Sequence, residues 1–168
     1  MHSFCELIER STSFILYSIE QAETEVIEQL QTSSATVYVK QLQMLQLQRS
    51  IFAVGMFSIF EAHLQNELNC SNGFTKVRTI LNAAGKHELK EKFDNYYSAI
   101  NALKHGDGGS YRKLVAKINV LEFHVETPHT PVYEEGDVSA IRSLIKADDA
   151  FILKCAELIR EISETIRE

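Results

Sequence analysis

A nearly apolar stretch lies in the first half of the sequence: Ile51-Phe52-Ala53-Val54-Gly55-Met56-Phe57-Ser58-Ile59-Phe60. It falls within a helix that we predict from about Val37 to Leu68. Because a helix without a polar face has to be covered on all sides, this stretch indicates the central helix of a bundle or a helix of a dimer. Gly55 costs about 1 kcal/mol relative to alanine in a helix interior. It therefore indicates either a close approach by a neighbouring backbone or tight packing within the chain.

Apolar residues recur with the 3.6-residue period of a helix on both sides of this stretch. The period predicts further helices at residues 4–30, 74–84, 86–104 and 139–167, and a brief one at 110–118. Ser110 is the predicted N-cap of the brief helix. From Asn119 to Asp137 the period is broken by alternating residues and by both prolines, which indicates a loop or a short hairpin.

The composition is typical of one helical domain. Of the 168 residues, 45% are hydrophobic and 24% are charged, which is the mixture expected of a solvated surface around a globular core. Seven glycines and two prolines leave few residues that would interrupt long elements. We therefore predict a single domain over residues 1–168. Its fold class is all-α, an up-and-down bundle of four or five main helices with the short loop or hairpin inserted before the last helix.

Charge and cysteine content limit the classes of function. The net charge of −6 gives no global attraction for a polyanion, so any nucleic-acid contact has to be local. Cys5, Cys70 and Cys155 are odd in number and form no CxxC pair, which favours inert thiols over a disulfide framework or a zinc site. No leader peptide or membrane span is recognisable, so we expect a cytoplasmic protein that does not contact the membrane.

Two histidines lie in the segment that breaks the helical period. In Glu122-Phe123-His124-Val125-Glu126-Thr127-Pro128-His129, the side chains of Glu122, His124 and Glu126 would share one face of a strand. No helical histidine pair or cysteine supports metal binding there, and a solvent-facing strand edge explains the pattern equally well. We expect neither a metal nor a cofactor.

The most informative motif is Asn101-Ala102-Leu103-Lys104-His105-Gly106, at the predicted end of a helix. Residues four apart share a helix face, so Asn101 and His105 should lie side by side. A histidine can act as an acid or a base near neutral pH, and an asparagine amide can hold a substrate oxygen or orient the ring. An ordinary helix end explains the same residues, because histidine favours a last helical turn and glycine is a common cap.

This motif and the Phe57-Ser58-Ile59-Phe60-Glu61 of the preceding apolar helix resemble the HEPN superfamily (higher eukaryotes and prokaryotes nucleotide-binding). The resemblance implies a compact helical bundle, usually dimeric. Many members are metal-independent endoribonucleases of toxin–antitoxin, abortive-infection and stress systems. The superfamily signature is an arginine, commonly a polar residue such as asparagine, three further residues and a histidine. Asn101 and His105 match this signature, but Ile100 occupies the position of the arginine.

Other cations lie close to the motif in sequence. Lys104 or Arg112 could supply the charge that the missing arginine would carry. Arg112 is the better candidate, because a lysine lacks the planar fork of a guanidinium. Ser110, Arg112 and Lys113 follow a glycine cluster at a predicted helix start, where backbone N–H groups can bind phosphate. A simple capped turn between two helices explains the same cluster.

The resemblance also gives the neighbouring helix a role. In HEPN members a polar or acidic residue there often holds the motif histidine, so Glu61 or His63 could face His105 and tune its pKa. The alternative for either residue is a structural ion pair or partial exposure to solvent.

Two function hypotheses follow from these observations. The first is a HEPN-like dimer that binds RNA or a nucleotide at Asn101, His105 and nearby cations, with metal-independent RNA cleavage by His105 and an antitoxin as an implied partner. The second is a non-catalytic HEPN-like module that binds a partner protein or its own copy through the apolar stretch 51–60. A small-ligand helical bundle unrelated to HEPN is a third reading.

Overall fold

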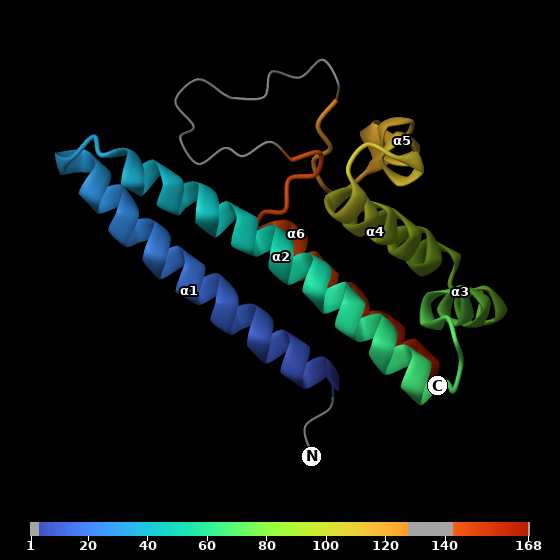
Figure 1. Ribbon diagram of the computed structural model, residues 1–168. Coiled ribbons are helices and arrows are strands. Elements are labelled where there is room, and N and C mark those ends of the chain that lie inside the picture. The colour runs from blue at the N-terminus through green and yellow to red at the C-terminus, as the bar shows by residue number, and fades with distance from the viewer. Residues whose placement is uncertain (1–3, 128–142, 168) are drawn as a thin grey trace.

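The computed structural model describes residues 4–127 and 143–167. Over these residues the predicted all-α bundle is confirmed (Figure 1). The helices are α1 (Phe4–Thr32), α2 (Thr36–Glu67), α3 (Gly73–Ala83), α4 (His87–His105), α5 (Gly109–Val115), a 3₁₀ helix (Ile118–Val120) and α6 (Asp149–Arg167). None of the helices in these ranges is long and apolar enough to cross a membrane.

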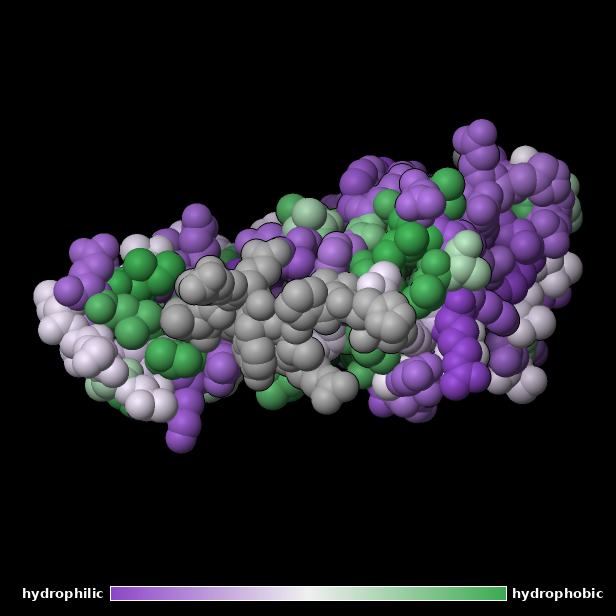
Figure 2. All heavy atoms as spheres, turned by 90° about the horizontal axis from the view of Figure 1, so that it is seen from above, coloured by the Kyte–Doolittle hydropathy of each residue, from purple (hydrophilic) through white to green (hydrophobic). Residues whose placement is uncertain are grey.

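The two longest helices form a hairpin that carries the rest of the fold. Helices α1 and α2 run side by side in opposite directions, and α6 packs behind α2 (Figure 1). Helices α3, α4 and α5 gather at the end of the molecule away from the α1–α2 turn. Figure 2 shows apolar side chains near that turn, whereas hydrophilic side chains dominate the opposite end.

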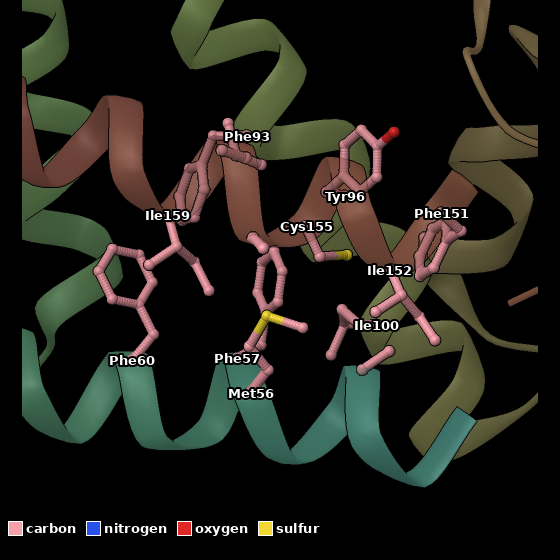
Figure 3. Close-up of a cluster of buried hydrophobic side chains, with 14 of the residues drawn as sticks. Met56, Phe57, Phe60, Phe93, Tyr96, Ile100, Phe151, Ile152, Cys155 and Ile159 are labelled. Carbon is pink, nitrogen blue, oxygen red and sulfur yellow. The ribbon is translucent and has the colours of Figure 1, made fainter. Parts of the chain in front are cut away.

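The core lies between α2, α4 and α6. Figure 3 shows large side chains from the three helices pointing toward one another. They are Met56, Phe57 and Phe60 of α2, Phe93, Tyr96 and Ile100 of α4, and Phe151, Ile152, Cys155 and Ile159 of α6. Each is at most 3% exposed, so the core holds α4 in a fixed orientation against α2.

A buried arginine joins three helices outside this core. The guanidinium of Arg49 in α2 donates from Nη1 and Nη2 to Glu23 of α1, at 2.5 and 2.8 Å. Its Nε donates to Asp149, the first residue of α6, at 2.6 Å. The hydrogen bonds that Arg49 donates to Glu23 and Asp149 raise its pKa despite its burial. Arg49 therefore keeps its charge and fixes the start of α6 against the hairpin.

Helices α1, α3, α4 and α6 pack against α2, but one strip of its apolar stretch stays uncovered. Ala53, Met56, Phe57 and Phe60 are buried, but Ile51 and Ile59 are 61% and 59% exposed. The expectation of cover on all sides is therefore wrong for a single chain. The reason is geometric, because no described helix packs on the face of α2 opposite α6 (Figure 1).

The predicted role of Gly55 is also wrong, and another glycine makes the close approach. A Cβ at Gly55 would meet no atom within 4 Å, so neither a neighbouring backbone nor tight packing lies there. A Cβ at Gly73 would lie 2.8 Å from Cβ of Leu64 and 3.0 Å from the carbonyl oxygen of Glu61. Helix α3 therefore starts in direct contact with α2, which only glycine permits.

The last helix begins later than the sequence predicts. Residues 143–148 precede α6, and Ile145 forms an isolated antiparallel bridge with Val125. Because Ile145 pairs with Val125, the backbone at Ile145 is not helical, although the spacing of the apolar residues there fits a helix. Asp148 then accepts a hydrogen bond from the N–H of Phe151 at 2.9 Å and so stabilises the helix start. The remainder of the predicted hairpin and helix start, residues 128–142 with His129, lies outside the described residues.

Candidate functional site at the end of α4

The motif residues lie on the outer side of the last turn of α4. Ala99, Ile100 and Ala102 are buried against the bundle, whereas Lys104 and His105 are exposed and Asn101 is half-buried. The helix ends because Gly106 adopts φ of +74°, and its N–H donates to the carbonyl oxygen of Ala102 at 2.9 Å. The predicted helix end and its glycine cap are therefore confirmed.

A small hollow brings three of the predicted residues together. Asn101 and Lys104 of α4 face Glu61 of α2 across a hollow of about 70 Å³. The other lining residues are Phe57, Ser58, Phe74, Tyr97 and Ile100. The volume suits about two water molecules or one small polar group. The hollow therefore combines an amide, an ammonium and a carboxylate above an aromatic floor.

His105 lies at the edge of this arrangement rather than inside it. Its side chain is exposed, and within the described residues it makes no hydrogen bond or ion pair. An exposed imidazole beside Lys104 is open to a ligand from solvent. The structure does not place Glu61 against the His105 ring, since Glu61 lines the hollow and His105 does not.

His63 takes part in a different contact. Its ring stacks on Phe4 with centroids 4.2 Å apart, and its Nε2 lies 3.3 Å from the carboxylate of Glu67. Residues two apart on a helix point to nearly opposite sides, so His63 cannot share the orientation of Glu61. The His63 ring therefore packs the start of α1 against the end of α2. This contact is structural, and it replaces the predicted role of holding His105.

The arginine position of the motif points into the core. Ile100 is 3% exposed and packs among α2, α4 and α6 (Figure 3). Ile100 also lines the hollow beside Lys104 and Glu61, where its side chain supplies apolar surface and no charge. Any positive charge for a bound phosphate therefore has to come from residues outside the position that the motif assigns.

The glycine cluster forms a turn with its own ion pair. Arg112 donates from Nε to Asp107 at 3.3 Å, and both side chains are largely exposed. Lys113 is exposed as well. The prediction of Ser110 as the N-cap is wrong, because α5 already begins at Gly109. Its N-cap is Gly108, and no side chain forms a cap hydrogen bond. Helix α5 has only seven residues, and Arg112 already pairs with Asp107, so the simple turn is the better description.

Sequence reasoning missed the aromatic floor of the hollow. Tyr97 precedes Asn101 by four residues, so their shared helix face could have been read from the spacing. Phe74 comes from another helix, and its ring lies 5.4 Å from that of Tyr97. Arg78 stacks on Tyr97 at 4.6 Å and donates to Asp94 at 2.5 Å. No local signal predicts these contacts between helices.

Residues 4–127 and 143–167 contain no group of three or more His, Cys, Asp or Glu side chains that could hold a metal ion. Their three cysteines are free thiols, and burial raises the pKa of Cys155 well above its ordinary value. No protein-family model, curated protein or solved structure matches the chain.

Proposed function

We propose that the protein is a HEPN-like RNA-binding module whose site is the exposed end of α4. The observation that supports this proposal is the grouping of Asn101, Lys104 and His105 in one helical turn beside the hollow. Lys104 attracts a phosphate, the amide of Asn101 holds a polar group of the nucleotide, and His105 stands next to both. In a toxin–antitoxin or defence system an antitoxin protein would be the partner that covers this site.

The same residues support a metal-independent cleavage reaction. His105 accepts the proton of a ribose 2′-OH, whose oxygen attacks the adjacent phosphorus. The bond from phosphorus to the 5′ oxygen then breaks, and that oxygen takes a proton from the imidazolium or from water. The products are a 2′,3′-cyclic phosphate and a 5′-OH end. Lys104 stabilises the negative charge on the phosphate oxygens during the attack.

The positive charge at this site comes mainly from Lys104. Arg112 is held by Asp107, although an exposed ion pair of this kind is weak and can exchange for a phosphate. Lys113 lies one residue further along α5 and is exposed. Because the whole chain carries a net charge of −6, this local group of cations has to overcome a general repulsion of RNA.

Replacing Lys104 by glutamine should weaken RNA binding at every sequence. The loss of one phosphate contact makes the negative slope of log K against log salt shallower by about 0.7 for single-stranded RNA. The measurement is fluorescence anisotropy with a labelled single-stranded RNA at several salt concentrations. Lys86→Gln is the matched control, because Lys86 is exposed just before the other end of α4. Equal weakening by both variants would show that only the net charge matters.

A second candidate function, a self-associating interaction module, is favoured by the outer face of α2. Between Gln41 and Phe60 the only charged residue is Arg49, which is buried, although 24% of the whole chain is charged. The large exposed apolar side chains of α2 are Val37, Met44, Leu47, Ile51 and Ile59, each about half exposed or more. Depletion of charge around exposed apolar residues is typical of the centre of a protein interface.

The spacing and the size of this outer face suit a second copy of the chain. Val37, Met44 and Ile51 follow one another at intervals of seven, with Leu47 between them, which is the pattern of a helix–helix seam. The face from Val37 to Ile59 is about 33 Å long, and with α1 beside it about 20 Å wide. This gives roughly 650 Å² per subunit, near the roughly 800 Å² that each partner buries in a standard interface.

Replacing Ile51 by glutamate should convert a dimer into a monomer. Ile51 is 61% exposed, so the folded chain tolerates the change, whereas a charge at the centre of the seam does not find a partner. Sedimentation equilibrium measures the mass of both proteins. Leu153→Glu is the control, because Leu153 is 52% exposed on α6. A wild-type chain that remains monomeric at high concentration would contradict self-association.

A further inference from the structure

A second hollow lies beside α4, toward the opposite end from the motif. It has a volume of about 360 Å³ and is formed by one face of α4 together with the chain around the 3₁₀ helix. Its lining residues are Glu88, Glu91, Lys92, Asn95 and Tyr96 of α4, with Val120, Glu122 and Phe123. The volume lies in the range of small-molecule sites.

Two buried polar atoms in this lining have no partner. The hydroxyl of Tyr96 and Oδ1 of Asn95 are shielded from solvent and form no hydrogen bond within the described residues. Tyr96 is only 1% exposed. Figure 3 shows its hydroxyl pointing away from the buried apolar cluster. An unpaired buried polar group destabilises a folded protein, so two neighbouring ones in one hollow indicate a ligand that pairs with them.

The charge of the lining identifies the class of ligand. Three carboxylates, those of Glu88, Glu91 and Glu122, surround the hollow, against one ammonium from Lys92. Burial raises the pKa of Tyr96, and the charge of Glu122 is among the causes that add to the rise, so the hydroxyl stays neutral and can accept a hydrogen bond. The exposed side chain of Val120 and the ring of Phe123 supply apolar surface.

We propose that this hollow binds a short linear polyamine, a flexible chain with two or more ammonium groups joined by methylene segments. The ammonium groups pair with Glu88, Glu91 and Glu122 and donate hydrogen bonds to Asn95 and Tyr96. The methylene segments lie on Val120 and Phe123. The site shares no residue with the end of α4 proposed to bind RNA, so the two proposals stand independently.

Calorimetric titration of the full-length protein with spermidine tests the proposal. We expect saturable binding with one molecule per chain, and at least about tenfold weaker binding by Glu91→Gln and by Glu122→Gln, because each loses a charged partner. Glu20→Gln on α1 is the control for net charge, since Glu20 is exposed outside the hollow. A diol of similar length tests whether the ligand needs the charge. Magnesium ions test whether it needs the methylene chain.

Tyr96→Phe provides a second, independent readout. The variant keeps the ring in the core and removes only the unpaired hydroxyl, so the melting temperature without ligand should stay the same or rise. The increase in melting temperature caused by spermidine should become smaller than in the wild type. The proposal is overturned by an absence of saturable binding, by equal weakening in Glu20→Gln, by equal affinity for the diol or magnesium, or by a lower unliganded melting temperature of Tyr96→Phe.

Discussion

Replacing Arg49 by alanine should lower the free energy of unfolding by about 3 kcal/mol, which is a large share of the 5–15 kcal/mol typical of a folded domain. The side chain of Arg49 is 7% exposed and holds Glu23 and Asp149 at once. Its removal leaves two carboxylates without a partner at the junction of α1, α2 and α6. Breaking a buried ion pair typically costs about 3–5 kcal/mol of stability. We expect a loss at the lower end of this range, because Asp149 is 48% exposed and can be rehydrated.

Urea denaturation followed by far-UV circular dichroism measures this loss. The control is Arg10→Ala, because Arg10 pairs with Glu6 one turn away on the surface of α1, with side chains 68% and 39% exposed. A surface pair of this kind contributes only a few tenths of a kcal/mol. If both variants lose the same stability, Arg49 does not join the three helices in the way described.

The positions of the helices could be predicted because they depend on local patterns. The apolar period gave the bounds of α1, α2, α3 and α4 to within two residues, and the glycine after His105 marked the end of α4. The start of α6 could not be predicted, because it depends on the pairing of Val125 with Ile145. The spacing of residues along one segment contains no information about such a distant partner.

The orientation of the helices was less accessible from the sequence. An apolar stretch that is buried on all sides and one that leaves a strip exposed can have the same composition, so the exposure of Ile51 and Ile59 was not foreseen. The contact of Gly73 with Leu64 and the network around Arg49 also join residues from different helices. They depend on the packing of the folded chain rather than on any local motif.

In the candidate site too, local spacing could be predicted, whereas contacts between helices could not. The placement of Asn101 and His105 in the last turn of α4 follows from their spacing and is confirmed. The separation of Glu61 from His63 follows from helical geometry, but which of them faces the motif depends on how α2 packs against α4. Ile100 lies on the apolar side of its helix, as the 3.6-residue period predicts, and its burial is confirmed.

Replacing His105 by alanine should reduce RNA cleavage by at least about a hundredfold, because general acid–base catalysis typically contributes a factor of 10²–10⁴. The side chain is exposed at a helix end, so its removal leaves the fold intact. His87→Ala is the matched control. His87 is the exposed first residue of the same helix, about 27 Å from His105 along the helix axis.

The most direct test of the proposed function is the incubation of purified protein with mixed cellular RNA in the presence of EDTA. Wild type, His105→Ala and His87→Ala are compared on a gel, and the new 3′ ends are identified chemically. We expect metal-independent cleavage by wild type and His87→Ala, with 2′,3′-cyclic phosphate ends, and its loss in His105→Ala. Cleavage that does not exceed the background of His105→Ala would contradict the ribonuclease and leave the self-associating module as the function.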